Sequence, residues 1–569
     1  MAVPEKLHYL LELKYFFPLK DFESVAKLFK NELESPDPNL AILSLVFGFM
    51  EHHLTDKSLL KKNAILDDRR QGTSDEGFPV LEFAVLYSMY ETYLKLIDQK
   101  FGIVLEADRT FLCDTDASTK AAFSTREKVK AVADFVWSQL STSYFKDRPH
   151  IQSIYSFLNG KRLDCFGVAL LVVATAQCIG YNDIHLVLSE DHAWISFGAG
   201  NKETAEVTWH GKRDGVKRGS PISQDSLVGF SKDWLYLGGN GMQCDRFMEV
   251  AAVVSAMNPG IDAKTDSEKL STLQQDLLWL LFNGGHLDKY PMAICNLADL
   301  EEIKATRKSP TLEELYEKAI GIAELEYDGC HVYPYTYYGG YLFRKELYSK
   351  ATICWKNAAL VAARYTHSRE DEELYKEFSE IANTFFPEIV KYCRNLKTKS
   401  NSDAPESEYF ASEENLTNII KFFDGICLWE EGGSTTVVHA EWAKNFLKLL
   451  NSFSFEIRTL CLKSSLEGGS NPEELSSRGL LILQSEKMKL MQESLCQEKI
   501  NTSVINLHLT SRVGLVADGK LNAKRGSGKF SAALLSQYSI VFIRELECFA
   551  EVQNKRGKAK NRYILYVVF

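Results

Sequence analysis

The chain has 569 residues, of which 45% are hydrophobic and 25% are charged. This is the ordinary mixture of a globular protein, and it excludes a mainly disordered chain and a fibrous one. The longest apolar stretch, Val168–Gly180, is shorter than the ~18–20 residues that a helix needs to cross a bilayer. Residues 1–21 lack the ordered basic, apolar and small-residue segments of a signal peptide. We therefore expect an intracellular protein that makes no contact with a membrane.

The cysteines are scattered along the chain. There are 12 of them, and none forms the Cys-x-x-Cys pair that binds zinc or catalyses redox exchange. Scattered cysteines in a long intracellular chain are mostly small buried hydrophobic residues. The sequence therefore predicts no disulfide, no structural zinc and no other cofactor.

Charge is distributed unevenly. The chain carries a formal net charge of −10, but the segment Arg512–Phe569 has 11 Lys and Arg against 4 Asp and Glu, a net of +7, which leaves −17 for the rest. An acidic body attracts basic ligands, and a basic tail is suited to weak contact with nucleic acid. The basic run Lys555–Arg562 also fits a nuclear-import signal. The alternative is a solvated tail with no partner.

Helices and polar stretches alternate in the first part of the chain. Apolar periodicity predicts helices within 6–60, 80–102 and 126–145. Three stretches rich in polar residues and Gly predict loops, namely Arg69–Pro79, Lys397–Asn415 and Ser464–Gly479.

A small α+β module follows. An apolar helix over Cys165–Gly180 leads into three predicted strands, 184–188, 193–197 and 205–209, of which the last two are joined by a hairpin connection at Gly198–Asn201. The fold class predicted from these patterns is mostly α with one small α+β module.

Helical hairpins are predicted again from 245 to about 395. Tyr335, Gly339, Ala351, Trp355 and Ala358 have the spacing of a tetratricopeptide repeat, in which small residues let two antiparallel helices pack closely. Looser units are predicted over 296–319 and from Glu372 to Val390. A stack of such repeats presents a concave surface that binds peptides. The alternative is an unspecialised set of helical hairpins.

Cys165, His192 and Glu206 form a candidate catalytic group. Cys165 stands at the start of the predicted apolar helix, where the positive end of the helix stabilises a thiolate. His192 begins a strand, and Glu206 lies on the next one. A nucleophile, a base and an orienting carboxylate in this chain order are typical of thiol enzymes of the papain and transglutaminase type. The alternative is a buried cysteine and a satisfied histidine on a scaffold that keeps the fold without the chemistry.

An acidic ridge is predicted on the helix after the repeat. Glu373, Glu377 and Glu380 are spaced i, i+4, i+7 and so share one face, where their mutual repulsion favours a basic ligand. Tyr333, Tyr337 and Trp355 precede them on the repeat helices. Carboxylates beside aromatic faces suit Arg or Lys. The alternative is a solvated acidic helix.

Long segments of the chain resemble the menin family of nuclear scaffold proteins. They include SYFKDRPHIQSIYSFLNGKRLD at 143–164, LWLLFNGGHLDKYPMAICNLADLEE at 278–302, HVYPYTYYGGY at 331–341 and REDEELYKEF at 369–378. The resemblance covers most of 20–512, and its segments are specific to that family.

The resemblance implies four domains. They are an N-terminal helical domain (1–112), a transglutaminase-like thumb (113–244), a palm of tetratricopeptide type (245–400) and a C-terminal helical fingers domain with the basic tail (401–569). Between thumb and palm the family has a deep central cavity. It binds short Arg/aromatic/Pro segments of the mixed-lineage-leukaemia type of histone H3 lysine-4 methyltransferase and of Jun-family transcription factors.

Carried over by motif, the implied cavity walls come from both domains. The thumb would supply Leu188, Ser189, Asp191, His192 and Ala193. The palm would supply Tyr290, Met292, Asn296, Tyr333, Tyr337, Trp355, Glu373, Glu377 and Glu380.

Three functions are consistent with these features. The favoured one is a nuclear, chromatin-associated peptide-binding scaffold that regulates transcription and is not an enzyme, with Cys165, His192 and Glu206 as a vestigial triad. The second is an active Cys-His-Glu thiol enzyme of the transglutaminase or peptidase type. The third is a protein that binds DNA directly through its tail.

Overall fold

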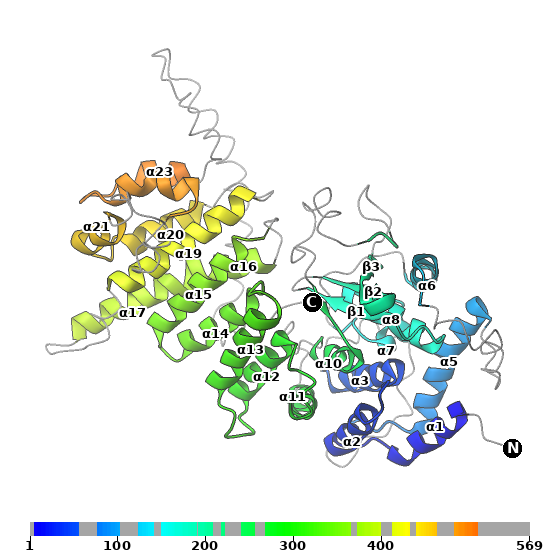
Figure 1. The fold of residues 1–569 in the computed structure, drawn as a ribbon. Helices are drawn as coiled ribbons and strands as arrows, with labels where there is room; N and C mark the ends of the chain where they lie inside the picture. The colour runs from blue at the N-terminus through cyan, green and yellow to red at the C-terminus, as the bar shows by residue number, and fades with distance from the viewer. Residues whose placement is uncertain are drawn as a thin grey trace.

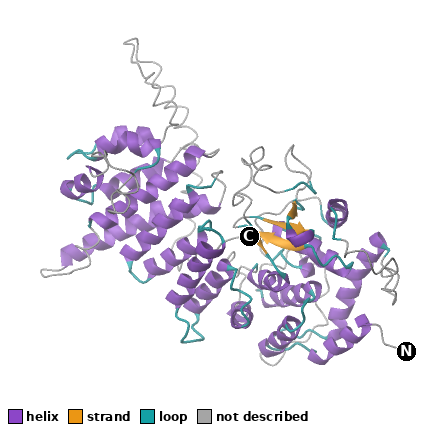
Figure 2. Cartoon of the chain, in the orientation of Figure 1, coloured by secondary structure: helices purple, strands orange, loops and turns teal. Residues whose placement is uncertain are grey.

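The structure is a computed structural model of the chain. It describes residues 5–55, 77–102, 123–141, 150–189, 192–208, 218–221, 241–256, 268–365, 373–399, 412–432, 440–463 and 483–509. These residues form a mostly helical protein with one small antiparallel sheet (Figure 2). The prediction of a mostly helical chain with a small α+β module is confirmed.

The N-terminal helices pack around one central helix, α3 (Leu40–Leu54). Thirteen of its residues are buried, so it is apolar on nearly all sides and other elements surround it. Asn39 begins α3 by accepting a hydrogen bond from the Ile42 amide at 3.1 Å. The other helices of this region in chain order are α1 (Glu5–Leu13), α2 (Phe22–Leu33), α5 (Phe83–Phe101), α6 (Arg126–Gln139) and α7 (Ile154–Gly160), of which α2, α5 and α7 pack on α3.

The sheet has four strands in the order β3-β2-β1-β4, all antiparallel. The strands are β1 (His185–Leu188), β2 (Ala193–Phe197), β3 (Glu203–Ala205) and β4 (Met242–Gln243). In the register of the hairpin, Leu188 pairs with Ala193 and Leu186 with Ile195. Helix α8 (Cys165–Cys178) packs on β1 and β2, so that every residue of β2 is buried.

The predicted strand 205–209 is wrong in its bounds. The observed strand β3 ends at Ala205, because the backbone of Glu206 bonds elsewhere: its amide donates to the Ser220 carbonyl at 2.9 Å, and its carbonyl accepts from the Gly219 amide at 2.8 Å. The predicted connection at 198–201 is confirmed as the link between β2 and β3, with a short 3-10 turn over Ala199–Asn201.

Helix α10 (Arg246–Ser255) joins the two halves of the molecule. It packs on β1 and α3 on one side and on α11 and α12 on the other. In Figure 1 the N-terminal helices and the sheet lie to the right, and the later helices lie to the left. The next helices form successive antiparallel neighbours: α11 (Glu268–Asn283), α12 (Pro291–Ile303), α13 (Leu312–Glu326), α14 (Tyr333–Arg344) and α15 (Tyr348–Ala362).

The described residues of the C-terminal part form helices joined by short connections. A continuous helical segment runs through α16 (Glu373–Glu380), a π-helical turn (Ile381–Phe385) and α17 (Phe386–Lys399). It is followed by α19 (Glu413–Gly432), α20 (Ala440–Leu450), α21 (Phe455–Lys463), α23 (Glu486–Leu495) and α24 (Thr502–Leu509). A buried ion pair between Lys487 Nζ and Glu430 Oε2 at 3.2 Å ties α23 to α19.

Other predicted bounds differ in part from the observed ones. The helix predicted over 126–145 ends at Gln139, and both ends of the loop predicted over Lys397–Asn415 are helical, since α17 extends to Lys399 and α19 begins at Glu413. The loop Ser464–Gly479, most of Arg69–Pro79 and the basic tail lie outside the described residues. The domain boundaries at 112, 244 and 400 stay predictions.

Helices α14 and α15 pack at a distance that only a glycine permits. A Cβ atom on Gly339 would lie 2.5 Å from Nε1 and 2.7 Å from Cδ1 of Trp355. The Trp355 ring is fully buried and stacks on Phe385, with centroids 5.5 Å apart and an interplanar angle of 16°. Because Phe385 packs on the buried indole, the ring has little room to move away from an added methyl group.

We predict that Gly339→Ala lowers the free energy of unfolding by about 1–3 kcal/mol, since it overpacks this contact. Gly321 lies within α13, and a methyl group added there would meet open space within 4 Å, so Gly321→Ala is the matched control. It should raise stability by about 0.5–1 kcal/mol through its better helix propensity. Urea unfolding of the two variants measures both effects. Equal changes in the free energy of unfolding for the two variants would show that the α14–α15 contact tolerates a side chain at position 339.

Candidate functional site

The structure brings Cys165, His192 and Glu206 together. Nε2 of His192 lies 2.9 Å from Oε2 of Glu206 and 3.2 Å from Oγ1 of Thr208. The Cys165 side chain lies close enough to the same ring to raise the pKa of His192. Three separate elements supply these groups: the first turn of α8, the start of β2 and the segment after β3.

Local structure fixes each of the three side chains. Asp164 begins α8 by accepting a hydrogen bond from the Gly167 amide at 2.7 Å, which places Cys165 in the first turn. The tight connection before β2 is closed by the Ser189 amide, which donates to the His192 carbonyl at 2.8 Å. Glu206 is held by Thr208, whose hydroxyl donates to Oε1 at 2.6 Å.

His192 and Glu206 form a buried ion pair. Burial by itself lowers the pKa of His192, but the Glu206 carboxylate and the Cys165 thiol outweigh it and raise that pKa to about 10. Burial raises the pKa of Glu206, but His192 and the Thr208 hydrogen bonds lower it below its usual range. The imidazole is therefore an imidazolium at neutral pH, next to a sulfur atom.

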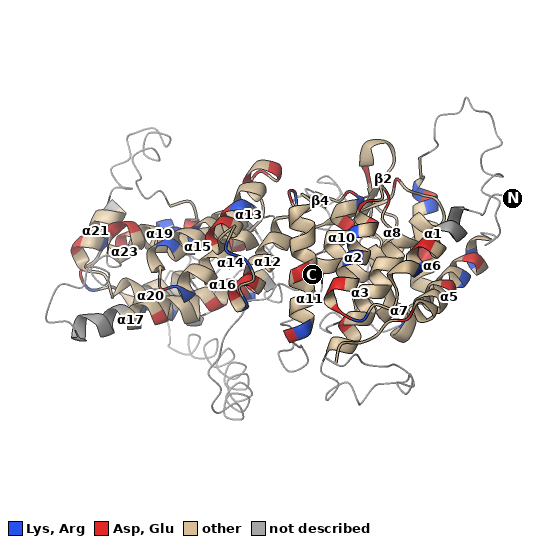
Figure 3. Ribbon diagram, turned by 90° about the horizontal axis from the view of Figure 1, so that it is seen from below, with Lys and Arg blue, Asp and Glu red and all other residues tan. Residues whose placement is uncertain are grey.

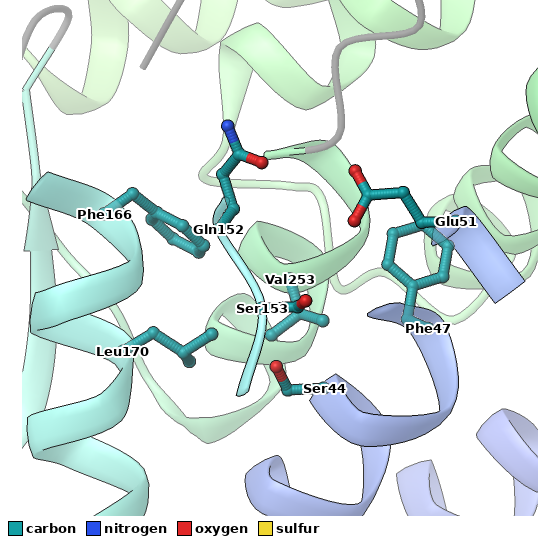
Figure 4. A pocket seen from close by; sticks show the side chains of 8 residues that line it. All are labelled: Ser44, Phe47, Glu51, Gln152, Ser153, Phe166, Leu170 and Val253. Atoms are coloured by element: carbon teal, nitrogen blue, oxygen red, sulfur yellow. The ribbon is translucent and has the colours of Figure 1, made fainter. Parts of the chain in front are cut away.

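A second polar group lies behind the start of α8. His150 Nδ1 is 2.8 Å from Oε1 of Glu51, and burial raises the pKa of Asp164 to about 7. Beside them is a cavity of about 10 Å³, which is room for about one water molecule. Figure 4 shows its walls, which come from α3, the segment before α7, α8 and α10, namely Ser44, Phe47, Glu51, Gln152, Ser153, Phe166, Leu170 and Val253.

The thumb residues of the implied peptide site cluster at one end of the β1–β2 hairpin. Leu188, Ser189, His192 and Ala193 are all buried, and Asp191 lies outside the described residues. The His192 amide donates to the Ser189 hydroxyl at 3.1 Å, so the two residues close the connection between the strands.

The palm residues of that site form a second group. Tyr290 and Met292 stand at the start of α12 and are buried, and Asn296 donates from Nδ2 to Oγ of Ser255 on α10 at 2.7 Å. Burial raises the pKa of Tyr290, whose hydroxyl also hydrogen-bonds Ser255. Ser255 therefore joins two of the implied residues, although no pattern in the sequence indicated it.

The aromatic residues are more deeply buried than expected for a binding surface. Tyr333 and Tyr337 on α14 are 2% and 3% exposed, and Trp355 on α15 is 0% exposed. Trp355 is enclosed by Phe343, Phe385 and Phe386. Trp355 is therefore a core residue that holds α15 against the neighbouring helices.

The acidic ridge lies on the face of α16 opposite its aromatic contacts. Tyr375 stacks on Trp442, and Phe378 meets Trp429 edge to face, which fixes one face of α16 against α20 and α19. The spacing puts Glu377 and Glu380 on the opposite face, and the side chain of Glu373 lies outside what the structure describes. Glu377 is nevertheless 7% exposed, and burial and Glu388 together raise the pKa of Glu380. That the three groups of implied residues surround one cavity stays a prediction.

His331 is a buried polar residue that no sequence pattern singled out. It lies two residues before α14, is 1% exposed, and stacks on Tyr327 with ring centroids 4.6 Å apart. Neither ring nitrogen has a hydrogen-bond partner among the described residues. Burial lowers the pKa of His331 to about 4. No spacing could have indicated this, because the pattern around His331 is that of an ordinary helix start.

Metal-binding clusters and membrane-spanning helices are both absent from the described residues. Among them no group of three or more His, Cys, Asp or Glu side chains could hold a metal ion. None of the helices in the described ranges has the length and apolarity to span a bilayer. Acidic and basic residues are mixed along the described helices (Figure 3).

Comparison with known proteins agrees with the sequence resemblance. The family model for menin matches residues 10–471 and 463–547. A solved structure described as "Crystal structure of menin reveals the binding site for Mixed Lineage Leukemia (MLL) protein" matches with a TM-score of 0.69 and 43% sequence identity, over 87% of this chain and 99% of that one. Helical hairpins and a small antiparallel sheet are thus the shared architecture, and the chain belongs to the menin family.

We predict that Glu206→Gln lowers the free energy of unfolding by about 3 kcal/mol at pH 7, because it breaks a buried ion pair. The folded-state pKa of His192 is raised, so the stability that the pair contributes is complete below about pH 6.5 and is lost as the pH rises through 10. The difference in the free energy of unfolding between the variant and the unmodified chain should therefore be less than half as large at about pH 9.5 as at pH 7.

Urea unfolding at the two pH values measures this change. Glu32→Gln is the control, since Glu32 is also buried but is held by Tyr9 and the Asn39 amide rather than by a histidine. A difference for Glu206→Gln that stays constant from neutral to alkaline pH would contradict the ion pair.

We predict that His331 makes the free energy of unfolding depend on pH in the opposite direction, on the acid side of neutrality. Its folded-state pKa is lowered, so the chain loses stability as the pH falls from about 6.5 towards 4, where the unfolded chain takes up a proton that the folded chain does not. His331→Phe keeps the stacking on Tyr327 and should lose about 2 kcal/mol less than the unmodified chain between pH 7 and pH 4.5. Tyr327→Phe should follow the unmodified chain, and urea unfolding at the two pH values compares the three. Parallel curves for all three would show that His331 takes up its proton in the folded state.

Proposed function

We propose that the chain is a nuclear, chromatin-associated scaffold that binds short peptide segments and has no catalytic role in doing so. The observation that carries the proposal is its membership of the menin family, with 43% identity over 87% of the chain to a menin whose structure is described as revealing the binding site for the MLL protein. The ligand proposed for this chain is an Arg/aromatic/Pro segment of an MLL-type histone H3 lysine-4 methyltransferase. A Jun-family transcription factor is a second ligand of the same kind, and transcription would be regulated through these partners.

The domain types belong to this proposal. Residues 113–244 would be the transglutaminase-like thumb, in agreement with the apolar helix α8 packed on an antiparallel sheet. Residues 245–400 would be the tetratricopeptide-type palm, in agreement with the close approach of α14 and α15 at Gly339. A cavity between the two would receive the peptide.

The charge of α16 supports a cationic ligand. Glu377 is almost removed from water, and Glu380 is partly buried close to Glu388. Burial weakens the screening of a carboxylate and strengthens its attraction for an arginine that displaces the remaining water. The π-helical turn that follows Glu380 directly fits this proposal, because π-turns within helices occur often at functional sites.

We predict that Glu377→Gln weakens the binding of an Arg-rich, Phe-Pro-containing methyltransferase peptide by about tenfold at low salt, because one charge-assisted contact is lost. The loss should be smaller at about 0.5 M salt, where the remaining attraction is screened. Isothermal titration calorimetry at the two salt concentrations measures both.

Glu23→Gln provides the matched control, because Glu23 is exposed on α2 and pairs with Lys27. It changes the net charge equally and should leave the affinity unchanged. Trp355→Phe is a better probe of the aromatic group than Trp355→Ala, since truncation of a fully buried indole would cost about 3–5 kcal/mol of stability. Equal affinity for Glu377→Gln and the unmodified chain at both salt concentrations would remove the acidic ridge from the peptide site.

A further inference from the structure

Ser309 lies in the exposed half of the connection between α12 and α13. The first half of this connection is anchored, because Glu301 accepts hydrogen bonds from the Thr306 amide at 2.8 Å and from the Arg307 amide at 3.3 Å. The guanidinium carbon of Arg307 also lies 4.3 Å from the centroid of the Trp279 ring. The anchored half therefore presents Ser309 to solvent at a fixed end of the helical hairpin.

Ser309 is one of three serines that a proline follows directly; the other two are Ser35 and Ser220. A proline directly after the acceptor serine is the feature that proline-directed protein kinases recognise, and phosphorylation of a serine adds a strongly charged group. By sequence alone the three serines are equivalent candidates for this modification, and the structure distinguishes among them.

Ser35 and Ser220 are both held by hydrogen bonds. The Ser35 amide donates to the Glu32 carbonyl at 3.1 Å, and the Ser35 hydroxyl accepts from the Asp37 amide at 3.3 Å. The Ser220 carbonyl accepts from the Glu206 amide at 2.9 Å. A kinase binds its substrate as an extended segment, so these bonds must open before either hydroxyl can react.

Ser309 needs no such opening. Neither its backbone nor its hydroxyl takes part in a hydrogen bond within the part of the chain that the structure describes. Its side chain is exposed, and so are those of the residues that directly precede it. The hydroxyl and its surroundings can therefore enter the active site of another enzyme without unfolding of α12 or α13.

The charges near Ser309 also suit a phosphate group. Lys308 is exposed and forms no ion pair among the described residues, so it can pair with a phosphate on its neighbour. Glu313 and Glu314 in the first turn of α13 already accept hydrogen bonds within the hairpin. Ser35, by contrast, has acidic residues on both sides, which would repel a phosphate.

We propose that Ser309 is a phosphorylation site, at which a proline-directed serine/threonine kinase transfers the γ-phosphoryl group of ATP to the serine hydroxyl. The Ser309 oxygen forms a bond to the γ-phosphorus as the bond from that phosphorus to the bridging oxygen breaks, and ADP leaves. The hydroxyl proton passes to the catalytic aspartate of the kinase. The modified end of the hairpin gains a charge of about −2 at neutral pH.

The proposed modification and the proposed peptide site lie at opposite ends of α12. Tyr290 and Met292 stand at the start of this helix, Ser309 follows its end, and a helix of 13 residues is about 20 Å long. That distance exceeds the range of about 8 Å over which exposed charges interact at physiological salt. Phosphorylation should therefore leave the affinity for the methyltransferase peptide unchanged, and either proposal can fail while the other stands.

The test is incubation of the full chain with ATP and a purified mitogen-activated protein kinase, which is proline-directed. Peptide mass spectrometry follows the phosphate on each serine over time. We expect Ser309 to be modified at least about tenfold faster than Ser35 or Ser220, because opening one or two hydrogen bonds lowers the reactive population by about that factor.

Three synthetic peptides of about 15 residues, each centred on one of these serines, are the matched control, since peptides of this length do not hold a stable fold. The ratio of the Ser309 rate to the other two rates should be at least about fivefold larger in the chain than in the peptides. Equal ratios would show that the fold does not select Ser309, and would contradict the proposal.

Two variants test the acceptor and the proline separately. Ser309→Ala should remove the fast phosphorylation, and Pro310→Ala keeps the hydroxyl but should slow its modification by more than about tenfold. Should Pro310→Ala fail to fold, the rates of the three serines in the unmodified chain decide. A Ser309 that reacts no faster than Ser35 and Ser220, or one that Pro310→Ala leaves unaffected, would overturn the proposal.

Discussion

Glu249 on α10 is the buried charge on which the arrangement of the two halves depends. Its side chain is fully buried, and its Oε1 accepts a hydrogen bond from the Leu186 amide at 2.8 Å and lies 3.1 Å from Nδ1 of His185. Arg246, one turn earlier, pairs with Glu249 and reaches Asp37 before α3 at 2.9 Å. A buried carboxylate is tolerated only where such partners surround it. Helix α10 therefore has one position relative to both β1 and the N-terminal helices.

The C-terminal end of α10 is hydrogen-bonded to the later helices and so fixes their position as well. Ser255 bonds Asn296 on α12, and Gln274 of α11 donates to the Val254 carbonyl at 3.0 Å. These hydrogen bonds are buried or partly buried and close to one another, so they fix the orientation of α11 and α12 and not only their distance. One helix of ten residues thus sets how the sheet faces the helical hairpins.

Much of this fold could be predicted from local patterns, and the exceptions have physical causes. Helix α8 and the strands β1 and β2 follow from an apolar run and two short strand patterns, and all three lie close to their predicted bounds. Strand β3 was misplaced because Glu206 and Thr208 look like strand residues in sequence, yet their side chains turn to His192 and the Glu206 backbone bonds Gly219 and Ser220. Such long-range competition for backbone partners leaves no trace in local periodicity.

Some residues of the candidate sites could likewise be predicted from the sequence, and others could not. The Cys165–His192–Glu206 group could be predicted because a nucleophile, a base and an acid have a recognisable order along the chain. Ser255 and His331 could not, since their importance comes from burial, which a single sequence does not reveal. Glu377 is intermediate: the i, i+4, i+7 spacing put it on one face with its neighbours, but only the structure shows that it is nearly covered.

His192 stabilises the connection between β1 and β2 from within and contributes little to its surface. Its ring contacts Glu206 and Thr208 and is 1% exposed, so a peptide has little access to it. The connection between β1 and β2 can present its backbone and the residues beside His192 to a ligand. The buried ion pair then serves the scaffold by fixing that connection, because a charged ring in contact with a carboxylate cannot change rotamer without exposing both charges to an apolar environment. The buried pair therefore gives this end of the hairpin a fixed shape, which is what a wall of the proposed peptide site requires.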